Sequence, residues 1–210
     1  MTVARTWSVA LSGLRGDMVE VEADLSQQTP EFSIIGLPDK ALGEAGRRGH
    51  NACANRGLDL PRRRLTVNLS PASLPKRGSG FDLAIAVAAL TTAGTMDAAR
   101  VGATVHLGEL GLDGRLRPVP GILPAVAAAI RAGHRRVVVP AGNQAEASLV
   151  AGAEVFAATC LAEVVRWHGG SCDARELAPV ATAAPADAVD AVPELADVGE
   201  SDVEDDADRG

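Results

Sequence analysis

The residue types that could do chemistry are concentrated in the stretch from Pro75 to Asp82, PKRGSGFD, where a glycine-rich turn precedes an apolar helix. Such a turn can hold a phosphate, expose a nucleophilic serine or simply allow the backbone to bend. A phosphate-binding P-loop needs a lysine and a hydroxyl residue after its last glycine, whereas here Lys76 precedes the glycines. Asp82 also stands near the helix N-terminus, where an anion would otherwise bind. We therefore expect no nucleotide site at this turn and no ATP hydrolysis by this chain.

A nucleophilic Ser79 would need a neighbouring histidine, or a lysine of lowered pKa, as its base. Lys76 lies three residues away, but both residues are expected on a flexible, exposed loop, where a lysine stays protonated. The chain's four histidines are scattered, with no pattern that favours a catalytic triad: His50, His106, His134 and His168. A peptidase that uses Ser79 and Lys76 is therefore the less favoured alternative.

The elements that position this turn follow from the hydrophobic pattern. Strands are predicted at 6–12, 17–25, 32–37, 64–69, 104–110, 115–119, 136–139 and 154–158. Helices are predicted at 39–55, 81–93, 122–132, 143–149 and 161–167. Asp39 and Asp82 are expected to cap the first two helices, and Asp113-Gly114 to form a hairpin turn. The mixture of hairpins and crossovers predicts an α/β (α+β) domain in two layers. Its core is expected to consist of Ala, Val, Leu and Ile, since aromatic residues make up only 2% of the chain.

Charge divides the chain into a body and a tail. Residues 1–170 hold 18 Lys and Arg against 15 Asp and Glu, whereas residues 171–210 hold 2 against 12. The acidic, Ala- and Pro-rich stretch 171–210 is therefore predicted to be a disordered tail or linker.

No signal peptide or apolar run of about 20 residues is found, and Cys53, Cys160 and Cys172 lack CxxC spacing. We expect a cytoplasmic protein with free thiols and no membrane partner.

Two further kinds of site were considered. A basic surface for nucleic acid or a partner is the first, formed by Arg62, Arg63, Arg64, Lys76 and Arg77, with Arg47 and Arg48 as further candidates. A solvated loop is the favoured alternative, and no aromatic platform for stacking bases accompanies these charges. Metal ligation by Glu109, Asp113 or the histidines is the second, but no two of them have the spacing of a metal site. We expect no metal and no cofactor.

Three runs of sequence carry a family resemblance: FSIIGLPDKALGEA, RRRLTVNLSPASLPKRGSGFDLAIAVAAL and LGELGLDGRLRPVPGILPAVAAAIRAGHRRVVVP. Their order and spacing resemble the N-terminal domain of the YifB/ComM family of magnesium-chelatase-like AAA+ proteins, over residues 5 to about 168. That domain is similar to the C-terminal protease domain of Lon and to domain 2 of ribosomal protein S5. The resemblance implies the S5 domain 2-like fold.

The Lon comparison also bears on the serine. Lon-type proteases carry the nucleophile in a PK-x-G-P-S-A-G run, and the matching position here is Gly80, with Ser79 one place earlier. The lysine base of Lon corresponds to Leu123. The resemblance therefore implies that neither residue of a Ser-Lys pair is present, that no residue is catalytic, and that the glycines serve backbone geometry.

The resemblance implies a non-catalytic accessory or assembly domain of a ComM/YifB-type ATPase, a family linked to DNA branch migration in natural transformation. Its expected partner is an AAA+ ATPase module, which follows in cis in relatives and could act in trans here, with oligomers formed only together with that module. Glu194 to Val198 resembles the opening of such a module, and no Walker motif follows, so we expect a truncated chain. A free-standing DNA-binding module is the alternative.

Overall fold

The structure is a computed structural model that describes residues 3–58, 60 and 63–172. The chain divides into two compact units, Met1–Glu176 and Leu177–Gly210, and every described residue lies in the first unit. Apart from residues 171 and 172, the predicted acidic tail lies outside the described residues, so that prediction remains untested.

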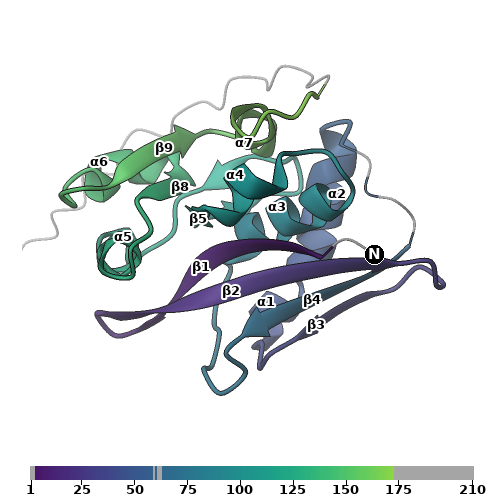
Figure 1. Ribbon diagram of the computed structural model, residues 1–210, viewed down its shortest axis with the longest axis horizontal. Helices are drawn as coiled ribbons and strands as arrows, with labels where there is room; N and C mark the ends of the chain where they lie inside the picture. Colours follow the sequence, from purple (N-terminus) through teal and green to yellow (C-terminus); the bar gives the residue numbers. More distant parts are fainter. Residues whose placement is uncertain (1–2, 59, 61–62, 173–210) are drawn as a thin grey trace, which may run out of the picture. The chain divides into compact units, whose positions relative to one another are not determined.

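The first unit is built on a seven-stranded sheet with the strand order β3-β4-β2-β1-β5-β8-β9 (Figure 1). The strands are β1 Ala4–Ser12, β2 Arg15–Ser26, β3 Phe32–Ile35, β4 Arg64–Ser70, β5 Thr104–His106, β8 Arg136–Pro140 and β9 Glu154–Ala158. β2 pairs antiparallel with β1 and β4, and the other neighbouring pairs are parallel. A separate hairpin joins β6 Glu109–Leu110 to β7 Leu116–Arg117. The α/β class expected from the sequence is confirmed.

Helices connect these strands and cover the sheet. They are α1 Lys40–Gly43, α2 Ala45–Asn55, α3 Asp82–Thr92, α4 Ala98–Gly102, α5 Ile122–Arg131, α6 Gln144–Ala147 and α7 Leu161–Trp167. α3 lies at the centre, with residues 82–91 all buried, and its alanines allow close packing on every side.

The two sheet faces are covered differently because buried side chains alternate along each strand. On one face, Val19, Val21 and Ala23 of β2 belong to the same apolar cluster as α3 residues. The opposite face is apolar towards the parallel strands and at the start of β2, where Val9, Met18 and Val137 belong to a cluster with residues of α5. In the antiparallel half this second face is polar and partly exposed, as the alternating acids of β2 predict.

Several predicted helix ends are confirmed by backbone geometry. The Asp39 carboxylate accepts a hydrogen bond from the Leu42 N–H at 2.8 Å and caps α1. Gly57, Gly94 and Gly133 follow the last residues of α2, α3 and α5 and have φ of 65°, 84° and 92°, a backbone angle that favours glycine.

Other element boundaries differ from the prediction. The predicted helix 39–55 is two helices, separated at Glu44. The predicted strand 104–110 is likewise split into β5 and β6, because Gly108 between them has a φ of 150°. α4 was not predicted, although its cap has an ordinary sequence signal: the Asp97 carboxylate accepts from the backbone N–H groups of Ala99 and Arg100.

Candidate functional site

Backbone hydrogen bonds join the glycine-rich turn before α3 to the chain segment that leads into β6. Gly80 O accepts a hydrogen bond from the Gly108 N–H at 3.0 Å, and Gly108 O accepts one from the Leu83 N–H at 3.1 Å. Gly78 has a φ of 80°, so this position requires glycine. Gly80 has no positive φ, and a Cβ there would meet nothing within 4 Å. Backbone geometry thus explains Gly78, as expected, but it does not explain Gly80.

The Ser79 hydroxyl donates a hydrogen bond to the carboxylate of Glu109 in β6. The guanidinium of Arg117 lies 4.0 Å from the other oxygen of this carboxylate. A serine nucleophile is normally activated by an adjacent imidazole or by a lysine of lowered pKa, whereas the partner of this hydroxyl is a carboxylate. The arrangement therefore orients Ser79 but gives it little activation as a nucleophile.

Lys76 is fully buried, and this corrects the expectation of an exposed lysine on a flexible loop that contributes to a basic surface. Its ammonium donates to three backbone carbonyls: those of Gly36 at 2.8 Å, of Leu69 at 2.9 Å and of Pro71. Burial lowers the pKa of Lys76, but an ammonium whose three protons are all donated has no lone pair with which to accept a proton. In this geometry Lys76 ties the loop before α3 to the ends of β3 and β4.

Leu123, at the position that corresponds to the lysine base of Lon, lies in the first turn of α5 and is 40% exposed. Its backbone N–H donates to Glu146 at 2.9 Å, and its side chain is aliphatic. Neither Gly80 nor Leu123 can transfer a proton through a side chain.

Asp82 does not cap α3, and this prediction was wrong. Phe81 occupies the cap position without a side-chain hydrogen bond, and the carboxylate of Asp82 is fully buried. It accepts two hydrogen bonds from Arg48 of α2, at 2.7 and 2.9 Å, and a third from the Leu110 N–H at 3.3 Å. Burial raises the pKa of Asp82, and the hydrogen bonds from Arg48 oppose that shift. The ion pair holds α2 against α3, so Arg48 does not act as a free surface cation.

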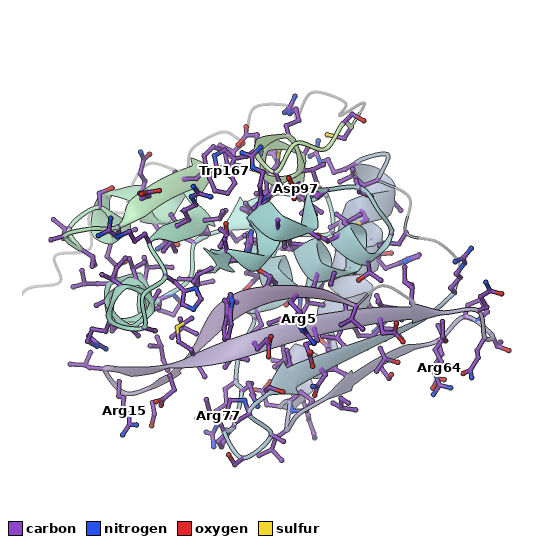
Figure 2. The ribbon with its side chains drawn as sticks, in the orientation of Figure 1. Arg5, Arg15, Arg64, Arg77, Asp97 and Trp167 are labelled. Carbon is purple, nitrogen blue, oxygen red and sulfur yellow. The ribbon has the colours of Figure 1, made fainter. Side chains whose placement is uncertain are left out.

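The remaining arginines of the predicted basic surface differ in their surroundings. Arg62 lies outside the described residues, and Arg63 and Arg77 are exposed. Arg64 is paired with Glu31 at 3.2 Å. Figure 2 shows Arg64 and Arg77 towards opposite ends of β4, whose seven residues span about 20 Å. A nucleic-acid surface that includes Arg63, Arg64 and Arg77 stays a prediction.

The fold also brings two histidines together that no sequence pattern connects. His106 Nδ1 lies 2.7 Å from the Thr6 hydroxyl, and His106 Nε2 lies 2.8 Å from His168 Nε2. Because the Thr6 hydroxyl can donate to the carbonyl of Thr104 at 3.1 Å, we assign His106 Nδ1 and His168 Nε2 as the protonated nitrogens. Both rings are fully buried; burial lowers the pKa of His168 to about 4 and that of His106 well below its usual value. The pair is therefore neutral at pH 7 and packs as a polar part of the core.

No group of three or more His, Cys, Asp or Glu that could hold a metal ion occurs within residues 3–58, 60 and 63–172. Glu109 and Asp113, considered above as ligands, have arginine neighbours instead: Arg117 at 4.0 Å and Arg115 at 3.0 Å. Within the same ranges, no helix has the length and apolar character needed to cross a membrane.

Comparison with known proteins finds relatives over most of the chain. A family model described as "Subunit ChlI of Mg-chelatase" matches residues 21–143. An uncharacterized protein of Mycobacterium tuberculosis is 46% identical over 198 residues, 94% of this chain and 39% of that protein. The competence protein ComM of Haemophilus influenzae is 37% identical over 182 residues, 87% of this chain and 35% of ComM.

A Lon protease of Mycolicibacterium smegmatis is a more distant relative, 28% identical over 144 residues, 65% of this chain and 18% of Lon. The chain thus spans well under half the length of these relatives. Because the family model covers more than half of the chain, this protein belongs to the magnesium-chelatase-like family that includes ComM, and it matches the N-terminal domain of that family.

Proposed function

We propose that this chain is a non-catalytic accessory or assembly domain of a ComM-type or YifB-type magnesium-chelatase-like AAA+ ATPase. The observation that carries the proposal is the chemistry at the turn before α3. Gly80 and Leu123 stand at the positions that correspond to the Lon nucleophile and base, and the nearby Lys76 donates all its protons to carbonyl oxygens. Ser79 has a carboxylate as its hydrogen-bond partner. These features support a scaffold that retains the Lon-like turn without its proton-transfer groups.

The expected partner is an AAA+ ATPase module. This chain covers 35% of ComM, so most of that relative's length lies beyond the region of similarity. In this proposal, an ATPase module in cis or in trans supplies ATP hydrolysis, and the present domain supplies a packing surface.

The test combines an activity measurement with a labelling measurement on the purified chain. We expect no ATP turnover and no labelling of Ser79 by a fluorophosphonate probe. The Ser79→Ala variant is the labelling control, because it keeps the turn and removes only the hydroxyl. Measurable ATP hydrolysis, or labelling that disappears in Ser79→Ala, would refute a non-catalytic role.

A second candidate function is DNA binding, which the exposure of Arg63 and Arg77 favours. If these arginines contact phosphates, binding to duplex DNA weakens with salt, and each lost contact reduces the slope of log K against log salt by about 0.9. The Arg63→Glu/Arg77→Glu variant is compared with Arg131→Glu/Arg135→Glu, an equal charge change at exposed residues near the end of α5. Equal retention of both variants on DNA would argue against this function.

A further inference from the structure

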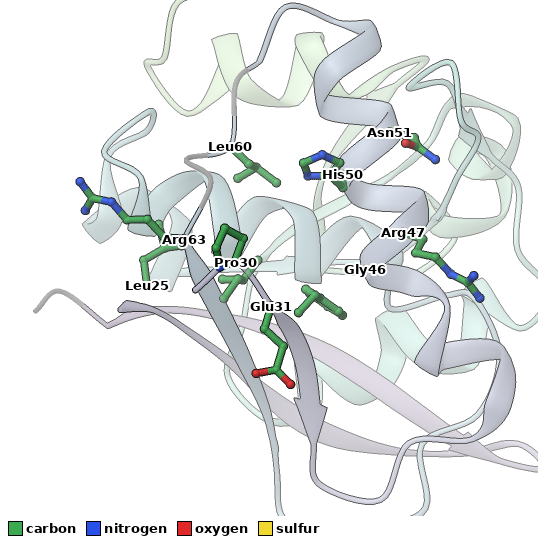
Figure 3. A pocket seen from close by; sticks show the side chains of 11 residues that line it. Leu25, Pro30, Glu31, Gly46, Arg47, His50, Asn51, Leu60 and Arg63 are labelled. Atoms are coloured by element: carbon green, nitrogen blue, oxygen red, sulfur yellow. The ribbon is translucent and has the colours of Figure 1, made fainter. Parts of the chain in front are cut away.

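A groove of about 510 Å³ lies between α2 and the first residues of β3 and β4 (Figure 3). Its apolar lining includes a row of side chains from three adjacent strands, because Leu25, Leu65 and Phe32 are paired neighbours across β2, β4 and β3. Leu60, in the segment before β4, adds a fourth apolar side chain to the lining.

The groove owes part of its form to Gly46 in α2. A Cβ at this position would lie 1.9 Å from Cε1 of Phe32, so only glycine lets the ring lie directly against the helix. This close contact gives a packing reason for a glycine inside a helix, where it costs about 1 kcal/mol relative to alanine.

Positive charge surrounds this apolar lining. Figure 3 shows Arg47 and Arg63 on opposite sides of the groove, with His50 between them. Arg63 is exposed and has no hydrogen-bond or ion-pair partner among the residues that the structure describes. The Arg47 side chain is 82% exposed, and its Nη2 lies 3.6 Å from Oε1 of the exposed Glu44. Such an exposed ion pair is weak, so Arg47 can still pair with a ligand. Among the lining residues that the structure describes, Glu31 is the one acid, and its pairing with Arg64 leaves the mouth of the groove favourable to an anion.

We propose that this groove binds a small amphiphilic anion: an apolar body of ring or short-chain form that carries one acidic group. The volume lies in the range of small-molecule sites, about 300–1,000 Å³. The apolar side chains would cover the body of the ligand, and Arg47 or Arg63 would pair with its acidic group at the rim. This site is separate from the turn before α3 and does not depend on the function proposed above.

The test uses two fluorescent probes that share a ring system. 1-Anilinonaphthalene-8-sulfonate carries one negative charge, and N-phenyl-1-naphthylamine is its uncharged counterpart. Their dissociation constants are measured on the whole chain, on Arg47→Glu/Arg63→Glu, and on the matched control Arg131→Glu/Arg135→Glu. Equal urea midpoints for the three proteins ensure that each probe reports on the folded state.

The sulfonate is expected to bind the groove variant at least about tenfold more weakly than the unchanged chain, since the loss of its one rim pair and the repulsion by the new carboxylates contribute about 0.7 kcal/mol each. Its affinity for the control variant and the affinity of the neutral probe for all three proteins should change less than about threefold, because the apolar lining is intact. Leu60→Ala should weaken both probes by about fivefold, corresponding to about 1 kcal/mol of lost apolar contact.

Location is checked by NMR titration, where the sulfonate should shift the amide signals of Gly46 and His50 in the unchanged chain. Equal weakening in the two double variants would overturn the proposal. So would chemical shifts confined to other surfaces, or no saturable binding of the sulfonate.

Discussion

Replacing Lys76 by methionine tests whether the buried ammonium holds the loop before α3 in place. The side chain has no exposed surface, and its three N–H groups converge on the carbonyls of Gly36, Leu69 and Pro71. Methionine has similar length and volume but no donor, so the variant removes the hydrogen bonds and leaves most of the apolar packing.

The magnitude follows from the balance of two effects. A buried acceptor left without a donor costs about 1–3 kcal/mol, and three acceptors are affected. Part of this cost is offset because methionine avoids the desolvation penalty of an ammonium. We expect Lys76→Met to lower the free energy of unfolding by about 3 kcal/mol, a large share of the 5–15 kcal/mol typical of a domain.

Urea denaturation followed by circular dichroism is the assay. With an m-value of about 2 kcal/mol per M, the midpoint should fall by about 1.5 M. Arg77→Met is the matched control: it removes a cation from the adjacent exposed position and should change the stability by less than about 0.5 kcal/mol. Lys76→Arg keeps the charge, but its planar guanidinium cannot direct protons at three converging carbonyls, so an intermediate loss is expected.

The reasoning fails if Lys76→Met and Arg77→Met have the same urea midpoint, because the ammonium would then contribute no net stability. If Lys76→Met is too unstable to purify, Lys76→Arg still decides the question. A midpoint for Lys76→Arg equal to that of the unchanged chain would contradict the requirement for a tetrahedral donor.

Three further predictions concern stability. In urea titrations, Gly78→Ala should destabilise the domain by about 1–2 kcal/mol because the φ of Gly78 is positive. Gly80→Ala should stabilise the domain by about 0.4–1 kcal/mol, because a Cβ there meets open space and alanine restricts the unfolded chain. Equal effects of the two variants would contradict the assigned turn geometry. Burial lowers the pKa of His168 from 6.5 to about 4, so its contribution is complete above pH 6.5 and decreases as the pH falls. About 2 kcal/mol from His168 should be lost by pH 5, and His168→Gln, measured by the same denaturation across pH, should lack this part of the loss while the part from the buried His106 remains. Gly46→Ala should lower the thermal midpoint because its Cβ overlaps the ring of Phe32, and recovery of stability in Gly46→Ala/Phe32→Leu would identify that overlap as the cause.

Features that depend on neighbouring residues in the chain could be predicted from the sequence. The Asp39 cap and the stop at Gly94 are local, since the side chain or backbone angle concerned acts within one turn of its own helix. The hairpin at Asp113-Gly114 is local as well, and its strands β6 and β7 flank the predicted turn. The three runs of family motif extended this prediction to the fold as a whole.

Features that depend on distant residues could not be predicted in this way. Asp82 has the sequence signal of a helix cap, yet its carboxylate bonds Arg48, which is 34 residues away. Lys76 has the sequence context of an exposed loop, yet it reaches the carbonyl of Gly36, 40 residues away. Propensity and periodicity describe what a residue does within its own element, whereas a buried charge is decided by which acceptors the tertiary fold brings near it.

In the turn before α3, the residues that fix the backbone path are distinct from the side chains that catalysis would need. Gly78 is fixed by its backbone angle, and the carbonyl of Gly80 is fixed by its bond to Gly108, so the path of the chain is determined without any reactive side chain. The space at the Cβ of Gly80 is open, so the fold does not forbid a serine at the position where Lon-type proteases carry one. A fold that has room for a serine at position 80 but carries glycine there keeps its backbone geometry and core packing without that side chain, as the non-catalytic role proposed above requires.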